Sequence, residues 1–206
     1  MSFGEGIRLG MQFLGDALVW AAAGYAIVAL CCVLRNRGNT RAGSTAAPRP
    51  VSVLKPLRGM APHLYENLRS FCTQDHPDYE LVFGVREADD PAIGVVARLR
   101  SEFPALAIKL VVDPCIHGAN PKVGNLINLF PQAGYDLLVI ADADIAVPPD
   151  YLARVAVPLA DPGVGIVTCL YRGLARGGFW ARLGRLFIDD WFIPSVRLAH
   201  AFGSTR

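Results

Sequence analysis

The sequence predicts an α/β fold: a mainly parallel sheet with helices on both faces, preceded by one transmembrane helix. Short apolar runs alternate along the chain with longer segments whose apolar residues recur at helical spacing. The short runs are apolar at nearly every position, which is typical of parallel strands that helices cover on both faces. An uncharged stretch near the N-terminus is long enough to cross a bilayer as a helix.

The uncharged stretch at residues 17–34 predicts a membrane anchor behind a tail of residues 1–16. As a helix it would extend roughly 27 Å, close to the thickness of a bilayer core. Arg35, Arg37 and Arg41 follow directly, so the positive-inside rule places the rest of the chain in the cytoplasm. A cleaved signal peptide would have a shorter apolar region and its basic residues on the other side. A buried helix of a soluble domain is a third interpretation, which the polar segment behind it disfavours.

The small, polar and proline-containing residues 35–50 predict a linker to one domain at residues 51–206. In that domain we expect strands at residues 51–57, 79–85, 107–112, 136–141 and 164–170. We expect helices at residues 62–72, 91–103, 122–130 and 149–159. Ligands of such sheets bind beyond the carboxyl ends of the strands, so the loops after the strands are the places to search.

Composition excludes several classes of function. A formal net charge of +2 is far from the basic balance of a nucleic-acid-binding protein. The five cysteines show no CxxC spacing and the four histidines are scattered, which argues against a disulfide framework and against a zinc site. No G-x-G-x-x-G follows the first expected strand, which argues against a dinucleotide-binding dehydrogenase.

The strongest local signal is Asp142-Ala143-Asp144, directly behind the apolar run that ends at Ala141. Two carboxylates separated by one residue at a strand end can face one hard cation. Mg²⁺ and Mn²⁺ take oxygen ligands and commonly share them between carboxylates and phosphates. Such a cation would neutralise a diphosphate leaving group. A solvated turn is the alternative interpretation of this tripeptide.

Two further loops carry polar groups. Glu87, Asp89 and Asp90 follow the expected strand at residues 79–85, where a carboxylate could accept a hydrogen bond from a nucleobase or ribose. Asp90 before a proline is equally well explained as an ordinary helix start. Lys122 lies in the first turn of an expected helix, a place that suits a phosphate, although a solvated lysine explains it too.

Four runs of residues together resemble ceramide glucosyltransferase-like enzymes, family 21 of the glycosyltransferases. These enzymes belong to the inverting GT-A group that also holds the hopanoid-biosynthesis glycosyltransferases of bacteria. The runs are SVLKPLRG at residues 52–59, DDPAI at 89–93, NPKVGNL at 120–126 and DLLVIADADI at 136–145. The resemblance covers nearly the whole chain, including the N-terminal anchor. It implies a GT-A fold that is incomplete at the C-terminus, a UDP-sugar donor and a membrane lipid acceptor of the ceramide or hopanoid type.

The resemblance also implies roles for single residues. Lys55 and Pro56 would line the nucleobase pocket, and Asp90, with Glu87 in the same acidic group, would contact the nucleotide. The remaining implied residues are Lys122 at the diphosphate, Asp142 at the diphosphate and metal, and Asp144 as a second metal carboxylate.

The base that deprotonates the acceptor hydroxyl is expected beyond Arg206. Asp189 and Asp190 lie before the position where the resemblance places it, within an aromatic segment. Residues 178–202 mix aromatic residues with arginines, which suits an element in a membrane interface or a helix packed against another part of the protein. Two other functions remain as alternatives: a nucleotide-sugar-binding membrane protein without turnover, and a glycosyltransferase of the polysaccharide-synthase type.

Overall fold

The computed structural model describes residues 3–35 and 48–202, which divide into two compact units. The unit that holds the sheet is Gly43–Val167. The other unit combines Met1–Ala42 with Thr168–Arg206. Most of the predicted linker lies outside the described residues, and the predicted domain boundaries stay predictions.

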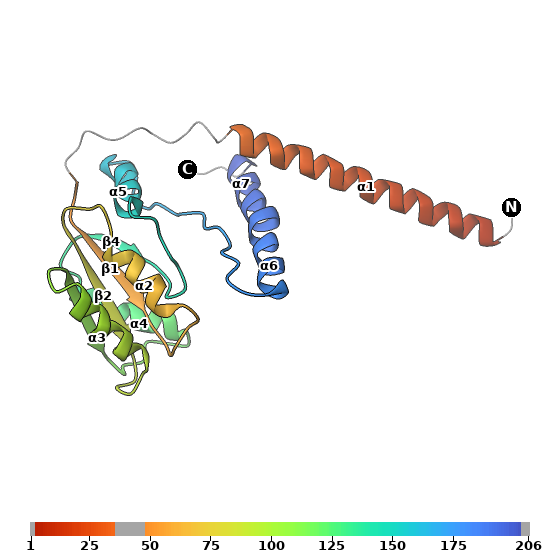
Figure 1. Ribbon diagram of the computed structural model, residues 1–206. Coiled ribbons are helices and arrows are strands. Elements are labelled where there is room, and N and C mark those ends of the chain that lie inside the picture. Colours follow the sequence, from red (N-terminus) through yellow and green to blue (C-terminus); the bar gives the residue numbers. More distant parts are fainter. Residues whose placement is uncertain (1–2, 36–47, 203–206) are drawn as a thin grey trace. The chain divides into compact units, whose positions relative to one another are not determined.

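Four parallel strands form the sheet, in the spatial order β3-β2-β1-β4 (Figure 1). The strands are β1 (Val51–Pro56), β2 (Tyr79–Val85), β3 (Ala107–Val112) and β4 (Leu137–Ile140). β1 is central and pairs Val51 with Tyr79 of β2 on one side and with Leu137 of β4 on the other. Nearly every side chain of β1 and β2 is buried, as expected for strands covered on both faces.

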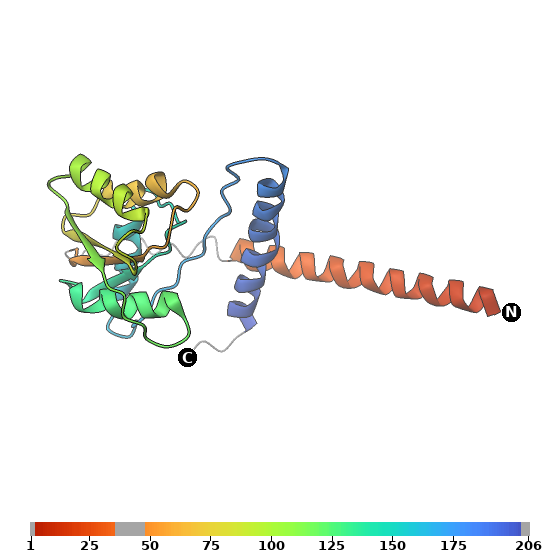
Figure 2. The same ribbon diagram turned by 90° about the horizontal axis from the view of Figure 1, so that it is seen from below.

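Helices cover both faces of this sheet, which confirms the predicted α/β class. The helices of this unit are α2 (Leu64–Cys72), α3 (Ala92–Glu102), α4 (Pro121–Leu129) and α5 (Tyr151–Ala156). Short 3₁₀ turns, η2 (Phe130–Gln132) and η3 (Val157–Ala160), extend α4 and α5. Figure 2 shows the sheet between α4 on one side and α2 and α3 on the other. The larger core includes Phe71 of α2 and Val96 of α3, whereas Leu129 of α4 packs on Leu54 and Val82 of the opposite face.

The predicted strand at residues 164–170 is wrong. The chain has no regular secondary structure from Val164 to Arg176, and Ile166 is 84% exposed. Within the described residues, β4 pairs only with β1, and residues 164–170 do not pair with its other edge. β4 is consequently an edge strand rather than a buried one, and Ile140 is 57% exposed.

Helices are the only regular secondary structure among the described residues of the second unit. They are α1 (Phe3–Arg35), α6 (Phe179–Leu186), the π-helical η4 (Phe187–Phe192) and α7 (Ile193–Phe202). Within α1, Gly10–Cys31 has a mean hydropathy of 1.7 and is long and apolar enough to cross a membrane. The helix begins at Phe3, inside the segment expected to be a tail.

The aromatic segment at residues 178–202 is helical and exposes much of its apolar surface. Trp180 is 78% exposed and Phe187 is 63% exposed. Tyr25 of α1 lies 5.6 Å from Trp191 between ring centroids, and its hydroxyl lies 3.1 Å from the Ser195 hydroxyl oxygen. Exposed apolar surface of this kind is typical of elements that lie in a membrane interface or pack against another part of a protein.

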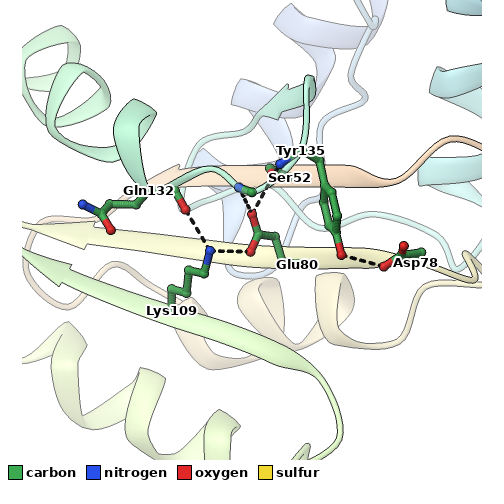
Figure 3. Close-up of polar contacts among 7 residues, drawn as sticks. Ser52, Asp78, Glu80, Lys109, Gln132 and Tyr135 are labelled. Atoms are coloured by element: carbon green, nitrogen blue, oxygen red, sulfur yellow. Dashed lines mark hydrogen bonds and ion pairs between the residues drawn. The ribbon is translucent and has the colours of Figure 1, made fainter.

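A buried carboxylate joins three strands near their amino ends (Figure 3). Glu80 of β2 accepts hydrogen bonds from the Ser52 hydroxyl, 2.6 Å away, and from the Gly134 amide. Lys109 of β3 lies 2.8 Å from the second Glu80 oxygen and also donates to the Gln132 carbonyl. Burial alone would raise the pKa of Glu80, but these hydrogen bonds together hold that pKa below its ordinary value.

Glu80→Gln should destabilise the fold by about 1–3 kcal/mol, because it leaves Lys109 without its buried anionic partner. Since the pKa of Glu80 is lower in the folded than in the unfolded chain, its contribution is present above the ordinary value of 4.5 and lost as pH falls through the folded value. Thermal unfolding at several pH values should show the gap between wild type and variant narrowing below pH 4.5. The control Glu66→Gln, at an exposed glutamate, should change neither the stability nor its dependence on pH. A stability difference between wild type and Glu80→Gln that does not vary with pH would contradict this role of Glu80.

Candidate functional site

A cavity of about 490 Å³ opens at the carboxyl ends of β1, β2 and β4 and at the amino end of α4. This is the edge at which parallel α/β sheets bind their ligands. The lining residues are Pro56, Leu57, Arg58, Ala61, Arg86, Glu87, Asn120, Pro121, Lys122, Asn125, Asp142, Ala143 and Asp144. Five residues implied by the sequence therefore share one cavity: Pro56, Glu87, Lys122, Asp142 and Asp144.

The loop that follows β1 forms one wall of the cavity, and the Asp90 side chain holds this loop in place by hydrogen bonds. Both Asp90 carboxylate oxygens accept from the Gly59 amide, at 2.9 and 3.2 Å, and one also accepts from the Ala92 amide at 2.8 Å. Gly59 has a φ of +64°, which a glycine adopts without strain. Asp90 is buried and does not line the cavity, so the structure gives it the role of a helix start and a loop anchor. A nucleotide contact of Asp90 stays a prediction.

Arg86 and Glu87 form the wall behind β2. The Arg86 Nε atom is enclosed, and within the described residues it has no hydrogen-bond partner. An enclosed guanidinium nitrogen without a partner suits an anionic ligand group. The acidic residues of this loop were site candidates from the sequence, whereas Arg58 and Arg86 were not. Each of these arginines directly follows an expected strand, and that position is the feature of the sequence that could have indicated them.

The amino end of α4 enters the cavity with its first turn capped by Asn120. The Asn120 side-chain oxygen accepts from the backbone amides of Lys122, at 3.1 Å, and Val123, at 3.3 Å, as at many helix starts. Asn125 donates to the Gly84 carbonyl at 2.9 Å and to the Leu57 carbonyl at 3.5 Å. This amide therefore fastens α4 to the ends of β1 and β2, a role that its position in NPKVGNL does not reveal by itself.

Asp142 and Asp144 follow β4 and line the cavity beside the amino end of α4. Lys122 forms an ion pair with Asp142, and both side chains are half exposed. The described residues contain no group of three His, Cys, Asp or Glu side chains that could hold a metal ion. Two carboxylates fit Mg²⁺ or Mn²⁺, because such ions keep waters and complete their ligand set with substrate phosphates. Asp142 and Asp144 are thus the residues that would hold the cation.

Lys55 does not line the cavity, contrary to the expectation for the nucleobase pocket. Its side chain is 0% exposed, because it points into the core face of the central strand, 3.7 Å from the centroid of the Phe71 ring. The Lys55 Nζ atom donates to the backbone carbonyl of Asp142 at 2.8 Å. Burial lowers the pKa of Lys55 to about 7, against the opposing attraction of Asp142 and Asp144.

Asp189 has partners of its own in the other unit. It accepts from the Gly173 amide at 3.0 Å and from Arg185 Nε at 3.0 Å. These two hydrogen bonds lower the pKa of Asp189, which makes it a weaker base. The structure thus gives it a local structural role.

The chain is similar in sequence to known glycosyltransferases. The family profile of glycosyl transferase family 21 matches residues 16–205. Ceramide glucosyltransferase 1 of Caenorhabditis elegans is 33% identical over 138 residues, which are 66% of this chain and 30% of the relative. Ceramide glucosyltransferase 3 of the same organism is 37% identical over 95 residues, which are 46% of this chain and 21% of the relative. The chain thus spans less than a third of the length of either relative.

A solved structure shows the same fold with ligands. The mannosyltransferase PcManGT from Pyrobaculum calidifontis, in complex with GDP-Man and Mn²⁺, is 28% identical, with a TM-score of 0.54. The match covers 75% of this chain and 46% of that chain. The fold is therefore of the GT-A type, as expected. Because the family profile spans nearly all of its residues, the chain belongs to glycosyl transferase family 21.

Proposed function

We propose that this chain binds a UDP-sugar in the cavity at the carboxyl ends of its strands, with a divalent cation on Asp142 and Asp144. The observation that carries this proposal is that both carboxylates share one cavity with Lys122, Arg58 and Arg86. Carboxylates for a cation beside cationic side chains for phosphate are the two elements that a nucleoside diphosphate requires. The GDP-Man and Mn²⁺ bound to PcManGT support the same chemistry.

We propose that the enzyme transfers the sugar to the hydroxyl of a membrane lipid, of the ceramide or hopanoid type, with inversion. The similarity to ceramide glucosyltransferases supports a lipid acceptor. A bound Mg²⁺ or Mn²⁺ would neutralise the diphosphate as it leaves. Lys122 would add a positive charge at the diphosphate, and Glu87 would accept a hydrogen bond from the nucleoside. We assign no base to the cavity.

We further propose that α1 anchors the domain to a membrane on its cytoplasmic side. Gly10–Cys31 supports the anchor by its length and hydropathy. The arginines at positions 35, 37 and 41 support the orientation, because cytoplasmic flanks carry the excess of basic residues. A lipid acceptor would then reach the domain from the membrane surface.

The transfer reaction can be tested on membranes that contain the 206-residue chain. Labelled UDP-glucose or UDP-N-acetylglucosamine is incubated with ceramide or a hopanoid alcohol, and the lipid fraction is analysed for labelled product. Product that disappears in Asp142→Asn supports the full proposal. Polymer in place of a single glycolipid supports a polysaccharide-synthase activity. Binding of the donor without product identifies a nucleotide-sugar-binding protein that does not turn over.

Lys122→Met should separate metal binding from nucleotide binding. Because Lys122 pairs with Asp142, its removal frees that carboxylate, and Mn²⁺ should bind more tightly in the absence of nucleotide. UDP should bind about tenfold more weakly, because the variant loses a charged contact to phosphate. A tenfold change in affinity corresponds to about 1.4 kcal/mol. Free Mn²⁺ followed by its EPR signal and UDP titration by calorimetry measure the two effects.

Lys109→Met is the matched control, because it also removes a lysine but lies at the other end of the strands. It should leave both affinities unchanged. If Lys122→Met weakens Mn²⁺ binding and UDP binding alike, the ion pair does not compete with the cation and this assignment of Lys122 is wrong.

A further inference from the structure

Lys55 has an unusual place for a lysine, fully buried in the central strand directly beneath the Asp142–Asp144 loop. Its Nζ atom contacts the Asp142 carbonyl at 2.8 Å and the face of the Phe71 ring, 3.7 Å to the centroid. Among the described residues, no carboxylate forms an ion pair with it. Lysines are almost never fully buried unless paired, because an ammonium loses its hydration there. Filling space alone would be served by an apolar side chain.

The loop that carries the two aspartates is fastened to β1 at two consecutive residues. The Ala141 amide donates to the Leu54 carbonyl at 3.2 Å, and the Asp142 carbonyl accepts from the next residue of β1, Lys55. The contact between Ala141 and Leu54 continues the pairing of β1 with β4. The contact between Lys55 and Asp142 lies one residue beyond the end of that pairing. Lys55 thus replaces a strand partner at the residue where the chain turns toward the cavity.

Lys55 approaches Asp142 from the side opposite to the cavity. Lys122 contacts the Asp142 carboxylate in the cavity, whereas Lys55 contacts the Asp142 backbone from the core. The Lys55 ammonium is also attracted by the side chains of Asp142 and Asp144. Lys55 therefore contacts the Asp142–Asp144 loop without occupying the cavity.

We propose that Lys55 is a positioning residue that holds the Asp142–Asp144 loop in the conformation that binds the divalent cation. This inference rests on the proposed function and adds to it a residue outside the cavity. Residues that orient metal ligands from behind commonly contribute about 10–100-fold to metal affinity. Lys55 acts through the backbone of the loop and touches neither nucleotide nor cation.

The test compares Lys55→Met with Lys109→Met in the full chain. Methionine has a similar length and fills the space beside Phe71, but it cannot donate to the Asp142 carbonyl. We expect Lys55→Met to weaken Mn²⁺-dependent UDP binding about 10–100-fold, with metal-free UDP binding unchanged. Lys109→Met, which breaks the ion pair with Glu80, should lose thermal stability without this change in metal dependence.

Three outcomes decide the question. If wild type shows no Mn²⁺-dependent binding of UDP, the proposed function itself fails. If wild type shows it and Lys55→Met retains it in full, the positioning role of Lys55 is refuted while the proposed function stands. If the loss in Lys55→Met is matched by an equal loss in Lys109→Met, the effect follows general destabilisation, and the positioning role is again refuted.

A second variant covers the case in which Lys55→Met does not fold. Phe71→Leu keeps the ammonium but removes the ring on which it lies. We expect a smaller decrease in Mn²⁺-dependent affinity, about two- to tenfold, since the lysine remains but is held less firmly. An unchanged metal dependence in folded Phe71→Leu would overturn the proposal.

Discussion

Asp142→Asn should abolish the Mn²⁺-dependent part of UDP binding, a loss of at least about 100-fold or roughly 2.7 kcal/mol. In the proposed site this carboxylate is one of two aspartate ligands of the cation, and an amide oxygen is a much weaker ligand for a hard ion. Metal-free UDP binding should not fall, because the substitution releases Lys122 from its ion pair. Calorimetric titration of UDP with and without Mn²⁺ measures both quantities.

The matched control is Asp150→Asn. Asp150 is an exposed aspartate at the start of α5, outside the cavity, and lies 3.6 Å from Arg154. Removing this exposed pair should leave nucleotide and metal binding unchanged. An Asp142→Asn protein that keeps wild-type metal dependence would show that the cation, if bound, lies elsewhere.

Gly84→Ala should destabilise the protein by about 1–3 kcal/mol and disturb the cavity at the same time. A Cβ atom at residue 84 would lie 2.7 Å from Leu129 Cδ2 and would overlap the Asn125 side-chain oxygen. Both clashing residues belong to α4, so relief of the overlap requires this helix to move away from β2. Movement would break the bond from Asn125 to the Gly84 carbonyl and shift Lys122. Thermal unfolding and UDP titration should therefore both report a loss.

Gly94→Ala is the matched control, because it is also a glycine-to-alanine substitution but is expected to raise the stability. Nothing lies within 4 Å of a Cβ added at Gly94, which is in the first turn of α3. Alanine there should stabilise the helix by about 0.5–1 kcal/mol and leave UDP binding unchanged. A Gly84→Ala protein as stable as wild type would mean that α4 is not fixed against β2 as the structure describes.

Much of the sheet could be predicted from the sequence, because its strands are apolar runs bounded by turn residues. The bounds of β2 and β3 are those predicted, Tyr79–Val85 and Ala107–Val112. The failure at residues 164–170 has a different origin. An apolar run becomes a strand only when it pairs with a neighbouring strand, and pairing is a property of the whole fold. No local pattern contains that information.

The residues expected at strand ends line the cavity, whereas two of the expected site residues are buried outside it. Asp142, Asp144 and Lys122 lie in the cavity because the topology brings the ends of β1, β2 and β4 together. Lys55 and Asp90 are polar residues in the same loops and strands, yet both are buried with backbone partners. Which face of a central strand a side chain enters depends on register, and that is fixed only when the sheet assembles.

Titration of UDP into the 206-residue chain, first without and then with Mn²⁺, tests most directly whether the cavity is a metal-dependent nucleotide site. We predict weak binding without the ion and markedly tighter binding with it, and the gain should vanish in Asp142→Asn. Binding that is equally tight without Mn²⁺, or no binding under either condition, would contradict the proposed site.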